Sequence, residues 1–462
     1  MAKYYNNINV RNIYLNLFFF QLFVSIWYLF QIDFSGNLYT QKSYIHIYDF
    51  FLYNLNIDVL SILFINLTSI IMIICILINW NLKYKIREFL NLLFVINIML
   101  VNVFLIFDLF LFYVYFEFIL IPMFLLIGIW GSRERKIQAA YKFFIYTLFG
   151  SLFMLIAILN IYYHFGTCDL QILQLQSISE IRQIIIAICF MIAFSVKVPM
   201  FPVHLWLPEA HVEASTTGSV ILASILLKLG TYAILRFMVP LFPAGLLYIS
   251  PFLFLFSLLS IIYASLSALR QTDLKRIVAY SSIAHMNFVI LGIFSMTLQG
   301  IEGSLFLMFS HALVSSALFI SVGFLYDRYK TRVIVYYSGL AQLMPIFSLI
   351  LFLFILSNFS FPGTSSFVGE FLVLIAALNS NNVVGFWAAT SICLSVAYSL
   401  WFYNRICFGN LNDKFLFNFS DLTLREFSIL LPLLFLNFFM GLFTTFFSDK
   451  WYSCIVYYTL RI

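Results

Sequence analysis

Residues 195–232 read SVKVPMFPVHLWLPEAHVEASTTGSVILASILLKLGTY, and this stretch decides how the chain folds. Its apolar residues are numerous enough to cross a bilayer, yet Lys197 and Lys228 lie among them. Pro199 and Pro202 follow Lys197, and each removes a backbone donor and clashes with the preceding helical turn. A charge near the centre of a bilayer costs roughly 2.5 to 3.5 kcal/mol. The stretch therefore predicts a membrane helix that is broken beside a buried lysine, a pattern typical of ion and proton pathways.

The composition of the whole chain points to the same environment. Of its 462 residues, 63% are hydrophobic and 10% are charged, and the mean hydropathy is +1.01. Such values exclude a soluble globular protein. Residues 55–78 and 182–196 are almost continuously apolar, whereas a membrane β-barrel would alternate apolar and polar residues. We therefore predict an all-α polytopic membrane protein.

Hydrophobic windows predict about thirteen transmembrane helices. They begin near Ile13, Leu55, Phe89, Leu109, Tyr141, Arg182, Thr216, Leu246, Asp273, Glu302, Leu340, Gly385 and Glu426. Positive residues then gather in the loops on the N-terminal side, namely Lys83, Lys85, Arg87, Arg133, Arg135, Lys136, Arg270, Lys275, Arg276, Arg328, Lys330 and Arg332. By the positive-inside rule, the N-terminus faces the compartment of synthesis and an odd number of spans places the C-terminus across the membrane.

Two acidic residues, Glu117 and Glu370, are stranded among apolar residues in the same way as the two lysines. A second break is expected at residues 361–364, Phe-Pro-Gly-Thr, just before Glu370. Glu117 and Lys197 are offset from His285 and Glu370 by about 170 residues, which indicates an internal repeat. We predict two inverted five-helix repeats, each with a discontinuous helix.

The predicted organisation has four parts. Residues 1–108 hold the N-terminal helices, 109–238 the first antiporter-like repeat, 246–408 the second repeat, and 409–462 a C-terminal helix and tail. Residues 1–12 are polar and the apolar run that follows them is long enough to stay as a span, so we expect no cleaved signal peptide.

Motifs for cofactor binding are missing from the sequence. The six cysteines never form a C-x-x-C pair, and no G-x-G-x-x-G, P-loop or haem-attachment motif occurs. We therefore expect any nucleotide, flavin or redox centre to lie on another chain. The net charge of +6 comes from loops, so nucleic-acid binding is not expected either.

Four motifs carry a resemblance to a known family. They are EFILIPMFLLIGIWG from Glu117, the stretch 195–232, RQTDLKRIVAYSSIAHMN from Arg270 and FPGTSSFVGEF from Phe361. Together they resemble the subunit 4 family of the mitochondrial NADH:ubiquinone oxidoreductase, respiratory complex I, over residues 109–405. That family usually has fourteen spans, so we expect its first helix to be lost here or supplied by another chain, and Ser215 stands where the family usually has proline.

The resemblance implies a proton-translocating, antiporter-like subunit of the membrane arm, and hence a subunit of an enzyme. It places the chain in the mitochondrial inner membrane, with the N-terminus in the matrix and the C-terminus in the intermembrane space. The implied partners are other membrane-arm subunits, including antiporter-like siblings, and phospholipids. NADH, FMN, iron–sulfur clusters and ubiquinone would then belong to other subunits, with no cofactor on this chain.

On this mapping, Lys197 is the switching proton carrier and Glu117 its counter-charge, because the spacing of opposite charges in a poorly solvated site controls proton affinity. Lys228 would receive the proton and His285 and His311 would relay it, since histidine titrates near physiological pH. Glu370 would be the terminal donor toward the intermembrane side.

Each role has a structural alternative. Glu117 and Lys197 would form a static ion pair, Lys228 would extend to an interface, the histidines would be packing residues, and Glu370 would cap the second half-helix. Two alternatives concern the whole chain: a cation/proton antiporter subunit, or a structural subunit that has stopped pumping.

Three more residues come from the segment after the first break. Glu209, His211 and Glu213 are expected to form an acidic mouth on the side of the positive loops, or else to cap the helix that begins at Thr216. We expect His204 to be structural.

Overall fold

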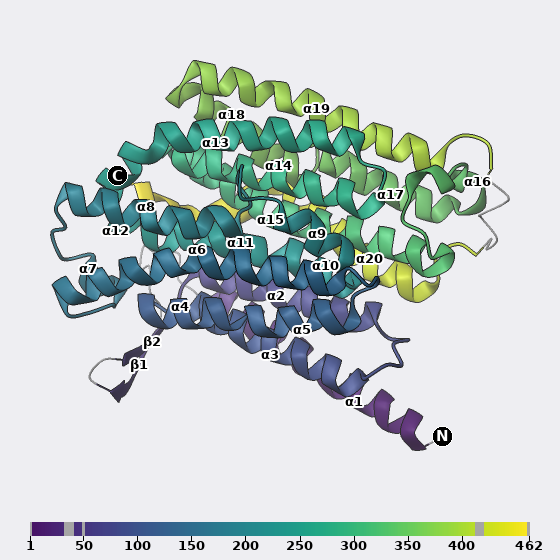
Figure 1. Cartoon of the computed structure of the whole chain (residues 1–462), viewed down its shortest axis with the longest axis horizontal. Coiled ribbons are helices and arrows are strands. Elements are labelled where there is room, and N and C mark those ends of the chain that lie inside the picture. Colours follow the sequence, from purple (N-terminus) through teal and green to yellow (C-terminus); the bar gives the residue numbers. More distant parts are fainter. Residues whose placement is uncertain (1, 32–40, 49–50, 412–419, 460–462) are drawn as a thin grey trace. The chain divides into compact units, whose positions relative to one another are not determined.

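The computed structural model describes residues 2–31, 41–48, 51–411 and 420–459 (Figure 1). Apart from one β-hairpin, the regular structure of this part of the chain is helical. The chain forms two compact units, and each combines segments that are distant in sequence. Unit 1 contains Met1–Lys197, Leu229–Ile249 and Ser448–Ile462, and unit 2 contains Val198–Lys228 and Ser250–Phe447.

Unit 1 begins with helix α1 and the hairpin. Its first elements are α1 (Ala2–Gln31), β1 (Gln41–Tyr48), β2 (Phe51–Ile57), α2 (Val59–Ile78), α3 (Ile86–Leu105), α4 (Leu109–Phe118) and α5 (Leu120–Trp130). They are followed by α6 (Lys136–Phe165), α7 (Leu170–Leu173), α8 (Glu180–Lys197), η2 (Ile234–Met238) and α12 (Val239–Leu241). Strands β1 and β2 are antiparallel, with Gln41 opposite Ile57.

Unit 2 contains the two broken-helix ends and the central helices. Its elements are α9 (Trp206–Glu213), α10 (Thr216–Ile221), η1 (Leu222–Leu226), α14 (Leu274–Phe294), α15 (Leu298–Tyr329), η3 (Ile334–Tyr336), α16 (Leu340–Leu343), α17 (Pro345–Asn358), α18 (Ser365–Ser380), α19 (Asn382–Cys407) and α20 (Leu424–Leu442). Three helices run across the boundary between the units along the chain: α11 (Leu227–Ala233), α13 (Pro243–Arg270) and α21 (Thr444–Thr459).

Eleven helical stretches of the described chain are long and apolar enough to cross a membrane. They correspond to eleven of the predicted spans. The sixth predicted span is α8, which carries three charged residues, Glu180, Arg182 and Lys197. The eleventh is divided into α17 and α18, each too short to span by itself. The all-α membrane fold is therefore confirmed, while the limits of the inverted repeats at 109–238 and 246–408 stay a prediction.

Both predicted helix breaks are present. Helix α8 ends at Lys197, and non-helical residues 198–205 separate it from α9. Helix α17 ends at Asn358, and α18 begins at Ser365 after a turn in which Gly363 has a φ of +96°. This left-handed conformation favours glycine, so the Pro-Gly pair both ends one half-helix and turns the chain into the next.

Other local features differ from the sequence-based expectations. The second span was expected near Leu55, but that residue belongs to strand β2 and the helix begins at Val59. The reason is a capping box in which the Asp58 carboxylate and the Ser61 hydroxyl each accept the other's backbone amide. The polar residues before Ile13 continue helix α1, which starts at Ala2. Two π-helical segments, η1 and η2, interrupt the span that begins at Thr216.

Close approach of two helices in unit 2 positions the candidate site. A Cβ atom on Gly303 of α15 would lie 2.9 Å from the Gly369 carbonyl oxygen, and one on Gly369 of α18 would lie 2.8 Å from the Leu307 nitrogen. Small residues allow helix backbones to touch in this way inside membranes. Glu370 directly follows Gly369, so its backbone lies beside this contact, while its carboxylate faces His285 of α14.

A buried ion pair anchors the start of α2 in unit 1. The guanidinium of Arg236 donates two hydrogen bonds to the Asp58 carboxylate, at 2.5 and 2.7 Å, and a third, of 3.1 Å, to the Tyr232 hydroxyl. Tyr232 in turn donates to the Phe104 carbonyl oxygen at 2.8 Å. Both charged side chains are only 3% exposed. The same aspartate therefore caps α2 and neutralises a buried arginine.

Replacing Asp58 by asparagine is expected to destabilise the chain severely. Asparagine keeps the cap, but it leaves the Arg236 charge buried and unpaired, a situation that costs about 3 to 5 kcal/mol. We expect little assembled protein on native electrophoresis, and recovery when Arg236→Gln is added to Asp58→Asn. Normal assembly of the single variant would contradict this view of the pair.

Asp108 caps α4 just before a membrane span begins. Its carboxylate accepts the amides of Phe110 and Leu111, both at 2.9 Å, and its backbone pairs with Asp169 in an isolated bridge. Burial raises the pKa of Asp108 to about 6, outweighing the two amide hydrogen bonds that lower it. The folded chain therefore holds this proton more tightly than the unfolded chain does.

The raised pKa of Asp108 makes the stability of the folded chain depend on pH. Because the folded pKa lies above the unfolded one, the stability contributed by Asp108 is complete below the unfolded pKa and is lost as the pH rises through about 6. We expect Asp108→Asn to remove this part of the dependence of thermal inactivation on pH between about 4 and 7. Identical pH profiles for the parent and the variant would exclude a contribution from Asp108.

Candidate proton-relay site

Two of the six predicted site residues meet in unit 1. Glu117 is the penultimate residue of α4, and Lys197 is the last residue of α8, where the negative end of the helix dipole favours a cation. Lys197 is 3% exposed, and its Nζ lies 4.2 Å from the centre of the Phe116 ring. The charges of Glu117 and Lys197 interact electrostatically. The Ser151 side chain also interacts with the Glu117 carboxylate.

The pair differs from the static bridge that was the structural alternative. Among the described residues no ion pair within 4.0 Å joins Glu117 to Lys197, and the Glu117 Oε1 atom has no hydrogen-bond partner. The two groups thus influence each other without being locked together. Whether this spacing changes during function belongs to the proposed role of the pair, for which opposite charges in a poorly solvated site control each other's proton affinity.

The other four predicted residues form one chain of contacts in unit 2. The Nζ of Lys228 lies 2.6 Å from Nδ1 of His311. The rings of His311 and His285 have centroids 5.7 Å apart. Nδ1 of His285 lies 3.0 Å from Oε1 of Glu370. All four side chains are buried, with exposed fractions between 0 and 6%.

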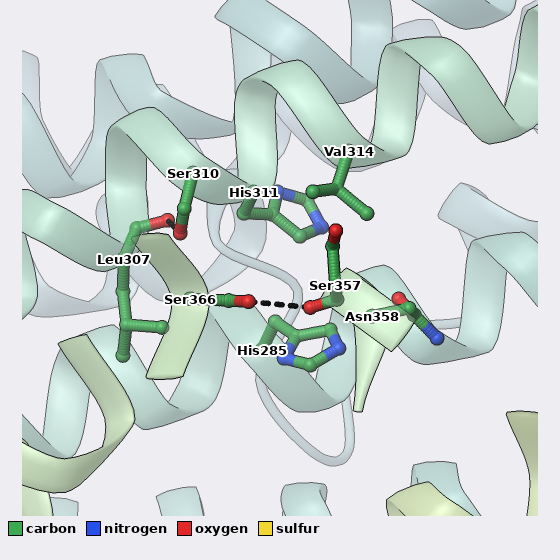
Figure 2. Close-up of a pocket in the computed structure, with 8 residues that line it drawn as sticks. All are labelled: His285, Leu307, Ser310, His311, Val314, Ser357, Asn358 and Ser366. Carbon is green, nitrogen blue, oxygen red and sulfur yellow. Dashed lines mark hydrogen bonds between the residues drawn. The ribbon is translucent and has the colours of Figure 1, made fainter. Parts of the chain in front are cut away.

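The two histidine rings border a small cavity, with room for about one water molecule. Figure 2 shows His311 and His285 on either side of the Ser357 side chain, with Ser310, Asn358 and Ser366 also lining the cavity. Within the described part of the chain, Nε2 of each histidine has no hydrogen-bond partner. A polar cavity with unsatisfied partners is the setting in which buried water is held.

A second cavity adjoins the other end of the chain of contacts. It is equally small and is lined by His285, Glu370, several apolar side chains and a group of polar residues from α13 and α19, namely Ser265, Ser391, Ser395 and Tyr398. Glu370 therefore has polar surroundings beyond His285. The expectation that it caps the second half-helix is not supported, because it is the sixth residue of α18.

The prediction of an acidic mouth is wrong, because most of its residues are buried. His211 and Glu213 are buried, and Glu209 alone of the three is half-buried. The ring of His211 stacks on that of Phe319 with centroids 4.7 Å apart. The alternative, capping of the next helix by these acids, is also wrong, because the Ser215 hydroxyl accepts the Gly218 amide at the start of α10. His204 packs against the rings of Phe201 and Tyr263.

Two cations that were counted as loop residues are buried at the end of α9. Lys275 donates from Nζ to the Ala214 carbonyl oxygen at 2.9 Å, and Arg332 donates to the carbonyl oxygen of Val212. Arg332 also lies 3.7 Å from Glu213. Carbonyl groups at a helix C-terminus lack partners within the helix, and cations there are favoured by the dipole. These two residues therefore supply hydrogen-bond donors to carbonyl groups at the C-terminal end of α9, the helix that follows the first break.

Of the buried cations outside the predicted site, the sequence indicated Arg236 but not Lys275 or Arg332. Arg236 lies within the apolar residues that follow Lys228, so the rule that found the four stranded charges also applies to it. Lys275 and Arg332 adjoin other charged residues and look like ordinary loop cations. Their role depends on contacts with residues about 60 and 120 positions away, which no local pattern reveals.

Replacing Lys275 by methionine is expected to weaken the end of α9. The Ala214 carbonyl would lose its donor, and an unsatisfied buried carbonyl costs roughly 1 to 3 kcal/mol. We expect the assembled protein to lose its activity at a lower temperature. Arg276→Met is the matched control, because the Arg276 side chain is 43% exposed and its nearest charged partner is Asp273, with a long Nε to Oδ2 distance of 3.8 Å. An equal effect of both variants would refute the capping role.

Comparison with known proteins supports the sequence resemblance. Residues 107–395 match the family described as NADH:quinone oxidoreductase/Mrp antiporter, transmembrane. NADH-ubiquinone oxidoreductase chain 4 of Marchantia polymorpha is 54% identical over 87% of this chain and 81% of its own length. The protein with the same name in Arabidopsis thaliana is 53% identical over the same shares of the two chains.

Solved structures show the same fold. A chain in respiratory complex I from Thermus thermophilus with bound NADH matches with a TM-score of 0.89 and 28% identity, covering 98% of this chain and 95% of that one. A chain in the Mrp complex from a Dietzia species matches with a TM-score of 0.86 over 100% of this chain and 95% of that one, at 18% identity. The second likeness concerns the fold alone.

Proposed function

Because the chain belongs to the chain 4 family of NADH-ubiquinone oxidoreductase, we propose that the buried residues described above carry protons through it. It is an antiporter-like, multi-pass membrane subunit of respiratory complex I, and the other membrane-arm subunits are its partners. The observation that carries the proposed route is the chain of contacts from Lys228 through His311 and His285 to Glu370.

Each contact in this route suits a proton transfer. Lys228 gives a proton to Nδ1 of His311, and the imidazole releases one from Nε2 into the cavity. Water held there passes a proton to Nε2 of His285, whose Nδ1 faces the Glu370 carboxylate. The polar residues of the second cavity then provide hydroxyl groups beyond Glu370.

Glu117 and Lys197 form the switching pair of the proposal. Opposite charges in a poorly solvated site favour each other's ionised forms, so a change in their spacing alters the affinity of Lys197 for its proton. Moving one charge across 100 mV requires about 2.3 kcal/mol, and one pKa unit corresponds to about 1.4 kcal/mol. A change of roughly two pKa units is therefore sufficient to drive one transfer.

The remaining details extend the family assignment to this chain. We place the chain in the mitochondrial inner membrane, with the N-terminus in the matrix and the C-terminus in the intermembrane space, because the positive loops gather on the N-terminal side. Phospholipids surround its apolar faces, and nucleic acid has no part in its function. NADH, FMN, the iron–sulfur clusters and ubiquinone belong to other subunits, so this chain contributes proton translocation and no redox step.

Isosteric removal of single charges tests the route in the intact complex. We expect Lys228→Met and Glu370→Gln to assemble but to reduce proton pumping and coupled NADH oxidation together by about tenfold or more, which corresponds to at least 1.4 kcal/mol. The matched controls are Lys83→Met and Glu88→Gln at exposed positions of unit 1. Assembly, NADH oxidation and pumping are measured separately on the same membranes.

The switching pair is tested in the same way with Lys197→Ala. Assembly with loss of pumping supports a moving charge at this position, because a merely structural cation would affect assembly first. Normal pumping by an assembled Lys197→Ala complex would favour the alternative of a subunit that anchors its neighbours without carrying protons.

A further inference from the structure

Asn437 is a fully buried residue of α20 that forms hydrogen bonds with both halves of the second broken helix. Its side-chain amide donates to the Ser357 hydroxyl at 2.7 Å, and its carbonyl oxygen accepts from the Ser365 hydroxyl at 2.6 Å. Ser357 lies in the last turn of α17, and Ser365 is the first residue of α18. One amide therefore joins the two half-helices across their break.

The backbone of α20 also touches the break. Gly441 follows Asn437 by one turn, and a Cβ atom there would lie 2.5 Å from the carbonyl carbon of Thr364 and 2.7 Å from the nitrogen of Ser365. These neighbours are backbone atoms and cannot turn aside. Because glycine at this position lets the backbones meet, the start of α18 at Ser365 is held against α20 by backbone contact.

Ser357, together with Ser366, which directly follows Ser365 in α18, forms part of the wall of the histidine cavity. The Ser366 hydroxyl donates to the Ser357 carbonyl oxygen, as Figure 2 shows, and both residues line the cavity with His285 and His311. Glu370 follows Ser366 by one turn of α18 and contacts His285. A shift of α18 against α17 would thus alter the cavity and the His285 to Glu370 contact together.

We propose that Asn437 is a positioning residue for the proton relay. By holding α17 and α18 at a fixed spacing, it keeps the Ser357 and Ser366 wall of the cavity in place and keeps Glu370 within hydrogen-bond distance of His285. Asn437 carries no proton itself, because it has no titratable group. This inference rests on the proposed function and adds to it a residue that lies outside the relay.

The test uses Asn437→Leu in the intact complex, because leucine has the same branching and the same number of side-chain heavy atoms and makes neither hydrogen bond. We expect assembled complex whose proton pumping per complex falls about fivefold to tenfold, since each buried hydroxyl loses a neutral hydrogen bond. Asn437→Gln retains the donor and the acceptor and should recover part of the pumping. Met440→Leu, an apolar exchange in the same helix, is the matched control and should pump normally.

A double-variant cycle separates positioning from general stability. If Asn437 acts through Ser357, the loss from Asn437→Leu and the loss from Ser357→Ala will not add in the combined variant. Fully additive losses, or normal pumping per assembled Asn437→Leu complex, would overturn the inference. Should Asn437→Leu fail to assemble, Ser357→Ala alone decides, and normal pumping by that variant would likewise overturn it.

Glu370→Gln in the same experiment distinguishes failure of this inference from failure of the proposed route. If Glu370→Gln abolishes pumping while Asn437→Leu does not, only the positioning role is wrong. If neither variant affects pumping, the proposed relay itself is wrong, and the positioning role is wrong with it.

Discussion

The structure depends on one constraint: at membrane depth, each polar group must find its partner within the protein or in an enclosed polar cavity. A continuous helix meets this requirement for its own backbone, but the chain breaks two helices and buries several charges. Those features persist because other parts of the chain supply the missing partners. Asn437 serves the break between α17 and α18, and Lys275 and Arg332 serve the end of α9.

The same requirement explains why charged residues of two kinds coexist in the chain. Arg236 and Asp58 are held by two short hydrogen bonds and are further fixed through Tyr232, so their charges are immobile. Glu117 and Lys197 lack such a direct contact. A fully satisfied pair contributes to structure, whereas an incompletely satisfied pair can respond to its surroundings.

Close packing of helices then brings the buried polar residues together in one site. Gly303 and Gly369 bring α15 and α18 into backbone contact, and His285 of α14 lies near His311 of α15 and bonds Glu370 of α18. Elsewhere in unit 2 the serine hydroxyls mostly return to carbonyl groups of their own helix, as Ser310 and Ser316 do. Ser310 lines the cavity between the histidines, yet its hydroxyl is already engaged by the Leu307 carbonyl, so among the described residues the imidazole Nε2 atoms are the polar groups there that still lack partners.

The sequence by itself determined the membrane class, the approximate spans, both helix breaks and the four stranded charges, because hydrophobic runs, prolines and isolated charges are local signals. The tertiary structure alone decided which of these residues touch, that Lys275 and Arg332 are buried, and that Asn437 joins two half-helices. Those facts depend on contacts between residues distant in the chain, such as the 72 positions between Ser365 and Asn437. The start of α2 also needed the structure, because an apolar run does not show where hairpin pairing ends and the Asp58 cap begins.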